Sequence, residues 1–190
     1  MVRADLFKWA SIPVIAGVAL MALSGCSGSS SAAPATATLA STKPQVQLLR
    51  NEAASRLDQD GMQDVTVTKD GSVACKAPDV DPKGLFRAWN STITFNVLPK
   101  QAQRVDAIGQ SVVNSFVKQQ WDASVQKGEN SSTTLLQKSG TSIDLRVGVE
   151  KDASSNGKKA TVSIQTTGAC VETGGADSEE VKKLEAAESK

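Results

Sequence analysis

Strict alternation of apolar and other side chains is the feature that most constrains the fold of this chain. It is clearest in two segments, with apolar residues at Ile143, Leu145, Val147 and Val149 and at Ala160, Val162 and Ile164. Because successive side chains of a strand point to opposite faces of a sheet, both segments predict half-buried strands. Asn156-Gly157 between them favours a two-residue hairpin turn, which would pair Val149 with Ile164.

Shorter alternating segments predict four more strands. Val65 and Val67 alternate with polar residues, and so do Val73 and Cys75. A three-residue turn at 69–71 would keep these four side chains on one face, whereas a two-residue turn would turn Val73 away from Val67. A longer strand runs over 89–97, and a short one lies within 133–138. We expect residues 76–85 and 122–132 to be irregular.

Two segments have the spacing of an amphipathic helix. Apolar residues recur at i, i+3, i+7 and i+11 in both, at Val46, Leu49, Ala53 and Leu57 and at Val105, Ile108, Val112 and Phe116. This spacing predicts helices over 45–58, with Pro44 at the start, and over 101–120. Trp121 follows the second helix and is predicted to cover the edge of the core, the alternative being a place in a ligand groove.

The predicted order of elements is αβββαβββ, which indicates an α+β fold. We expect an antiparallel sheet of about six strands with two helices on one face, in a single domain over residues 45–173. The charged segment 174–190 offers only Val181 and Leu184 for docking, so it is predicted to be disordered. A tail that binds a partner is the alternative.

The N-terminal segment has the character of an export signal. An apolar run over 9–22 follows Arg3 and Lys8, and it is short for a membrane-spanning helix, which needs about 20 residues. Residues 27–44 are mostly Ser, Ala, Thr, Gly and Pro. Such a composition buries too little apolar surface to offset the entropy of ordering, so 26–44 is predicted to be a flexible tether.

Between the apolar run and the tether, Leu23-Ser24-Gly25-Cys26 resembles the bacterial lipobox. The resemblance implies that the signal peptide 1–25 is removed and that Cys26 carries a diacylglycerol. Two acyl chains anchor a protein stably, whereas one holds it only marginally. The protein would then lie on the extracytoplasmic face of the bacterial cell membrane. A plain secretion signal with a free cysteine and an uncleaved anchor helix are the alternatives.

Lipidation of Cys26 leaves Cys75 and Cys170 as an even pair. Exported chains meet an oxidising compartment, where such pairs usually close. We therefore expect a disulfide between Cys75 and Cys170, with both side chains pointing into the core from neighbouring strands. Two unpaired buried thiols are the alternative.

Composition excludes several classes of function. The chain has no His, which rules out Ser-His-Asp and Cys-His catalysis and a His-based zinc site in their usual forms. Without residues 1–25 it keeps 19 basic and 19 acidic side chains, whereas a nucleic-acid-binding protein usually has a basic excess. Asp79 and Asp81 lack the further ligands of a calcium loop. We expect no metal, no cofactor and no nucleic-acid partner.

The carboxylates elsewhere do not form a recognisable catalytic pair. Asp106, Asp144 and Glu150 fit solvent-exposed faces of their elements. An enzyme that uses carboxylates or a lysine-activated serine is therefore the least favoured class.

The chain as a whole resembles the small actinobacterial cell-envelope lipoproteins. It shares with them the lipobox, the Ser/Thr/Ala tether and a cysteine late in the domain, here at the end of Thr166-Thr167-Gly168-Ala169-Cys170. Most such proteins have no assigned activity, so the resemblance transfers no functional residue beyond Cys26. With an anchor, a tether and no catalytic constellation, we expect a non-enzymatic lipoprotein that binds a protein partner or an envelope component. A carrier with an apolar cavity for a lipid or glycolipid between sheet and helices is the alternative.

Overall fold

The computed structural model describes residues 37–155 and 158–188. The signal peptide 1–25, the lipidation site Cys26 and the first part of the tether lie outside this range and stay predictions. Within the described range, no helix is both long and apolar enough to span a membrane.

The described residues form one antiparallel sheet with helices, which confirms the α+β class. The strand order is β1-β2-β6-β5-β4-β3, and a short β7 pairs with β2 beyond the end of β6. The strands are β1 Met62–Ala74, β2 Phe86–Val97, β3 Asp122–Lys127, β4 Ser131–Gln137, β5 Asp144–Lys151, β6 Ala160–Thr167 and β7 Val171–Glu172. The helices are α1 Leu39–Ser55, α2 Val105–Val117 and α3 Glu179–Ala186, with 3-10 turns at Gln59–Gly61, Pro99–Arg104 and Ala153–Ser155.

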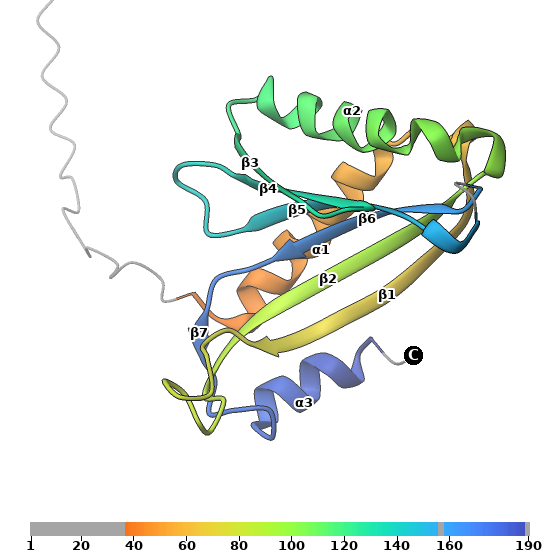
Figure 1. Ribbon diagram of the computed structural model, residues 1–190. Coiled ribbons are helices and arrows are strands. Elements are labelled where there is room, and N and C mark those ends of the chain that lie inside the picture. Colours follow the sequence, from red (N-terminus) through yellow and green to blue (C-terminus); the bar gives the residue numbers. More distant parts are fainter. Residues whose placement is uncertain (1–36, 156–157, 189–190) are drawn as a thin grey trace, which may run out of the picture. The chain divides into compact units, whose positions relative to one another are not determined.

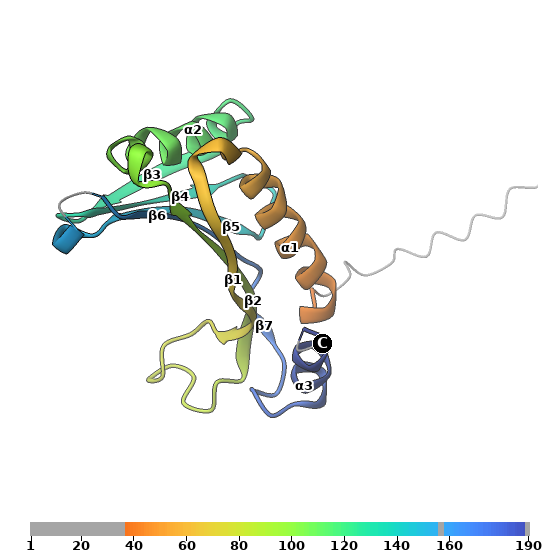
Figure 2. The same cartoon turned by 90° about the vertical axis from the view of Figure 1, so that its right-hand side faces the viewer.

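Helices α1 and α2 cover the same face of the sheet (Figures 1 and 2). Helix α1 packs on β2 and β6, and α2 packs on β5 and its neighbours. Alternating residues of the strands meet them in the main core, whose largest fully buried members are Phe116, Leu136, Leu145, Ile164, Val105, Val112 and Val162. The other face of β2 and β6 is polar, with Thr94, Asn96, Thr161, Ser163 and Gln165. One sheet therefore has an apolar helix side and a polar open side.

The second predicted helix is confirmed in its core. Its four spaced apolar residues, Val105, Ile108, Val112 and Phe116, are all buried. The predicted first residues form the 3-10 turn Pro99–Arg104 instead, and the helix ends at Val117. Trp121 is 8% exposed and packs edge-on against Phe116 with 5.4 Å between ring centroids. It covers the core edge as predicted.

Helix α1 begins at Leu39, six residues earlier than predicted. Thr38 and Ser41 form a capping box, and the buried Leu39 joins the core in the first turn. Pro44 therefore lies inside the helix, where the carbonyl of Ala40 loses its usual N–H donor. Because Ala40 is exposed, water can satisfy that carbonyl. The predicted tether 26–44 is thus wrong for residues 39–44, which form the first turns of α1.

The predicted turn at 69–71 is wrong, because β1 is one continuous strand of 13 residues. Its pairing with β2 shifts between Val67 and Lys69, which is the signature of a β-bulge with one extra residue. Beyond the bulge, Asp70 pairs with Ser91 on the helix side of the sheet. The chain therefore continues through 69–71 without a turn. After the bulge, even-numbered β1 residues face the helices, whereas before it odd-numbered residues do.

Two other predictions about the strands need correction. Residues 122–127, predicted to be irregular, form β3, which pairs with β4 over its whole length. Val149 pairs with Val162 rather than with Ile164. Because the connection 152–159 is longer than a two-residue turn, the register moves by two residues. A shift of two keeps the apolar faces together.

The predicted disordered tail 174–190 is also wrong for its described part. Ser178 caps α3, and Val181 is fully buried against α1 and the sheet. Lys43 Nζ lies 2.6 Å from a carboxylate oxygen of Glu188 and donates a hydrogen bond to the carbonyl of Leu184 at 2.9 Å. The folded domain therefore extends beyond the predicted 45–173 at both ends.

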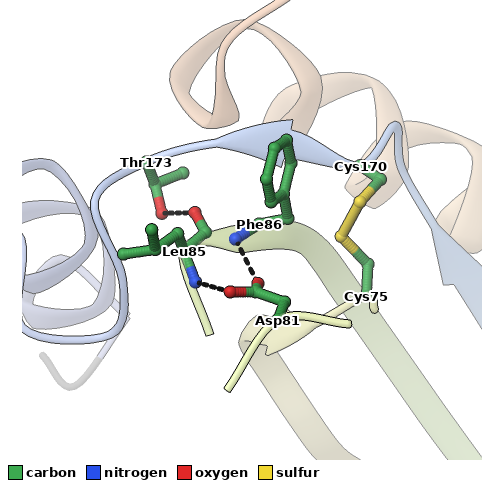
Figure 3. The surroundings of a disulfide bond; sticks show 6 residues. All are labelled: Cys75, Asp81, Leu85, Phe86, Cys170 and Thr173. Atoms are coloured by element: carbon green, nitrogen blue, oxygen red, sulfur yellow. Dashed lines mark hydrogen bonds between the residues drawn. A yellow bond between two sulfur atoms is a disulfide. The ribbon is translucent and has the colours of Figure 1, made fainter. Parts of the chain in front are cut away.

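The disulfide between Cys75 and Cys170 is confirmed, with 5.8 Å between the Cα atoms. Its predicted place in the core is wrong, because Cys170 is exposed and Cys75 is partly exposed. Nor do their strands pair, since β2 lies between β1 and β6. The bridge joins residues just beyond β1 and just before β7, beside Phe86 (Figure 3).

Candidate functional site

Strand β3 forms one edge of the sheet. It pairs with β4 on one side, and in the described part of the chain no strand pairs with its other side. All six of its side chains are exposed, including Val125 at 55%. Such an edge presents unpaired backbone N–H and C=O groups, which can bind an added strand.

A groove of about 490 Å³ lies between β3, β4 and helix α2, which runs above this half of the sheet (Figure 1). Its volume falls within the usual range of ligand sites, about 300–1,000 Å³. Val113 of α2 and Val147 and Val149 of β5 form an apolar floor. The other lining residues are Asp106, Gly109, Gln110, Val125, Lys127, Gly128, Glu129, Asn130, Ser131, Ser132, Thr134 and Lys151.

Gly109 lines this groove where α2 packs closely on β5. A Cβ atom at this position would lie 2.5 Å from Cγ2 of Val149, so only glycine lets α2 approach β5 this closely. The helix contacts β5 more extensively than β3, and Val125 is left exposed beyond it. An ion pair between Lys151 and Asp106 borders the groove. The groove thus combines an apolar floor, a charged rim and an unpaired strand edge.

A buried polar cluster lies elsewhere, between α1 and the β1–β2 pair. Both oxygens of the Asp70 carboxylate accept hydrogen bonds, Oδ1 from Trp89 Nε1 and Oδ2 from Arg50 at 3.1 Å, Gln47 at 2.9 Å and Ser91 at 3.1 Å. The side chains of Arg50 and Asp70 are 10% and 9% exposed. Within the described residues no buried side-chain polar atom lacks a partner. The cluster therefore satisfies itself and holds α1 on the sheet.

The structure does not bring the candidate site residues of the sequence analysis together in one place. Cys75 and Cys170 are bonded to each other, and Cys26 lies outside the described residues. Asp106 pairs with Lys151, and Asp144 lies 3.7 Å from Arg146. In the described segments no group of three or more His, Cys, Asp or Glu side chains could hold a metal ion.

Asp81, the residue considered for calcium, instead closes the loop between β1 and β2. Its carboxylate accepts hydrogen bonds from the backbone N–H of Leu85 at 2.9 Å and of Phe86 at 2.7 Å (Figure 3). The bond from Phe86 is the largest cause that lowers the pKa of Asp81 below its ordinary value, with Leu85 and the charge of Lys76 adding to it and burial opposing it. The carboxylate is thus committed to the backbone of its own loop.

Sequence reasoning missed the groove because it missed β3. Ala123 and Val125 alternate with polar neighbours, as in a strand, but two apolar residues are too few to predict a strand. Comparison with known proteins adds no constraint: no family model, curated protein or solved structure matches this chain.

Proposed function

We propose that this protein is a non-enzymatic lipoprotein, anchored to the extracytoplasmic face of a bacterial cell membrane through Cys26, that binds a protein partner or envelope component. The groove between α2 and the β3–β4 hairpin is the binding site. The observation that carries this assignment is the unpaired edge of β3 beside an apolar floor. Strand edges next to grooves are a recurrent way of binding extended protein segments.

Val125 provides the test of the groove. Because its side chain is 55% exposed, Val125→Asp should leave folding intact while placing a charge beside the apolar floor. A photo-crosslinking residue at position 125 of the anchored chain would identify the partner in intact cells. We expect the purified partner to bind Val125→Asp at least about tenfold more weakly than the unmodified chain, a loss of about 1.4 kcal/mol.

Val80→Asp is the matched control. Val80 is also exposed, at 68%, but lies in the loop between β1 and β2 and does not line the groove. Its substitution should leave the affinity unchanged. Equal affinities of both variants and the unmodified chain would show that the partner binds elsewhere.

The anchor has a separate test. Cys26→Ala removes the thiol that would carry the diacylglycerol, so the variant should be released into the medium or remain unprocessed. Cell fractionation and mass spectrometry of the N-terminal peptide measure both outcomes. If the variant were still diacylated and bound to membranes, the lipobox assignment would be wrong.

The carrier alternative receives less support. Apart from the groove, the space between the sheet and α2 is occupied by fully buried side chains such as Phe116, Leu136 and Leu145. A stoichiometric lipid retained by the purified protein in native mass spectrometry would favour the carrier function instead.

A further inference from the structure

We propose that the exposed face of α1 lies directly on the lipid surface to which Cys26 anchors the chain. This inference rests on the anchoring part of the proposed function and does not depend on the groove. It assigns to α1 a second role besides its packing on the sheet, as the surface that orients the domain on the membrane.

The exposed face of α1 carries no charge over its first three turns. The exposed residues between 37 and 51 are Ala37, Thr38, Ala40, Ser41, Pro44, Gln45, Leu48 and Asn51. The two basic residues of this stretch point away from solvent. Lys43 is 12% exposed and pairs with Glu188, and Arg50 is 10% exposed and pairs with Asp70. Surface helices usually have charged residues on the outer face, and the exposed residues of α3 include Lys182, Lys183 and Glu185.

This uncharged face includes an apolar row. Ala40, Pro44 and Leu48 are spaced i, i+4 and i+8, so they lie on one side of the helix. Leu48 is 70% exposed, the largest value among the exposed large apolar residues of the described chain. Among the described residues, no helix or strand covers the outer side of α1 (Figure 2), and α3 meets only its first turns, where Glu180 accepts a hydrogen bond from the N–H of Ala40. A leucine so placed gains free energy by leaving water.

The length of chain before α1 indicates a lipid surface as the occupant. Leu39 lies only 13 positions after Cys26, which limits the reach to about 45 Å even when the chain is fully extended. The first turn of α1 is therefore the part of the folded domain nearest to the anchor along the chain. A tether of this length keeps the face at a high effective concentration next to the membrane. A weak apolar contact is then sufficient, although it would not hold a free protein.

The chemistry of the face also defines how the contact should behave. Membrane binding by a surface helix combines apolar burial with attraction of basic residues to anionic lipids. The exposed residues between 37 and 51 have no charge, and the exposed Glu52 that follows them is paired with Arg56 and is acidic, so the attraction of basic residues to anionic lipids does not apply. The contact should therefore be the same on zwitterionic and anionic vesicles and insensitive to salt, in contrast to a contact made by exposed lysines.

The test uses the full diacylated chain in phosphatidylcholine vesicles that contain a brominated lipid as quencher. An environment-sensitive fluorophore is attached through Leu48→Cys, or through Val125→Cys as the matched exposed control. We expect strong quenching at position 48 and little at position 125. Quenching at 48 should be unchanged by about 0.5 M salt or by added phosphatidylglycerol. With the fluorophore at Gln45→Cys instead, adding Leu48→Glu should reduce the quenching at least about threefold.

Three other results would contradict the proposed contact of α1 with lipid. A diacylated chain whose label at 48 is quenched no more than the label at 125 overturns this inference and leaves the proposed anchor intact. Shielding at 48 that depends on protein concentration and not on the brominated lipid would assign the face to a second copy of the chain, and also overturns it. A mature chain without diacylglycerol by mass spectrometry contradicts the proposed function and the inference together.

Discussion

The carboxylate of Asp81 shows how much one side chain can determine about a loop. Two neighbouring aspartates, Asp79 and Asp81, look alike in the sequence. Only Asp81 is buried, at 8% exposure, and bonded to backbone N–H groups. Whether its carboxylate binds a metal ion or backbone N–H groups depends on the positions of Leu85 and Phe86 in the folded chain. Sequence spacing alone could not establish that.

The lowered pKa of Asp81 predicts an effect of pH on stability. A carboxyl group whose pKa is lower in the folded than in the unfolded chain adds stability above its ordinary pKa, about 3.9. That contribution is lost as the pH falls through the lowered folded value. Asp81→Asn should therefore be less stable than the unmodified chain at pH 7 and should lose less stability on acidification. Urea unfolding between pH 7 and pH 2.5 measures this. Asp79→Asn, exposed in the same loop, should follow the unmodified curve.

At the level of elements, the sequence predicted the regular segments and missed those that depend on distant partners. The helix around Val112 and the strands β2, β5 and β6 follow from apolar spacing alone. The bulge in β1 does not follow from spacing. The Asp70 carboxylate is stabilised on the helix side of the sheet only because Arg50 and Trp89 donate hydrogen bonds to it there. Helix α3 likewise shows few apolar residues, and its docking depends on the pocket that buries Val181.

The bulge and α1 are coupled through Asp70, which yields a prediction for these elements. Asp70→Ala would leave the guanidinium of Arg50 buried without its carboxylate. Removing one partner of a buried ion pair typically costs about 3–5 kcal/mol, so the free energy of unfolding in urea should fall by that amount. Asp64→Ala in the same strand, where Asp64 is exposed, should change it by less than about 0.5 kcal/mol. Equal effects of the two substitutions would mean that the pair contributes no net stability.

For the folded domain as a whole, the two proposed surfaces belong to different halves of one sheet. Helix α1 packs on β2 and β6, whereas the groove lies beside β3 at the edge beyond β5 and β4. A domain that rests on lipid through α1 would therefore keep the edge of β3 free for a partner. The anchored end and the binding end would be separated by the width of the sheet. The α1 face consists of exposed residues, whereas the floor of the groove is formed by the core residues Val113, Val147 and Val149.

The disulfide connects two segments 95 residues apart, so its removal tests how the C-terminal part is held to the rest. It fixes the chain before β7 and α3 to the end of β1, and loss of a native disulfide typically costs about 2–5 kcal/mol. The variant Cys75→Ser/Cys170→Ser should lose that amount in urea unfolding. Amide hydrogen exchange should increase first in β7 and α3, because they follow the bridge directly.

Thiol titration of the unfolded, non-reduced chain is the control, and two reactive thiols would contradict the bridge. Uniformly faster exchange across β5 and β6 as well would mean that the bridge stabilises the whole domain and not mainly its C-terminal segment.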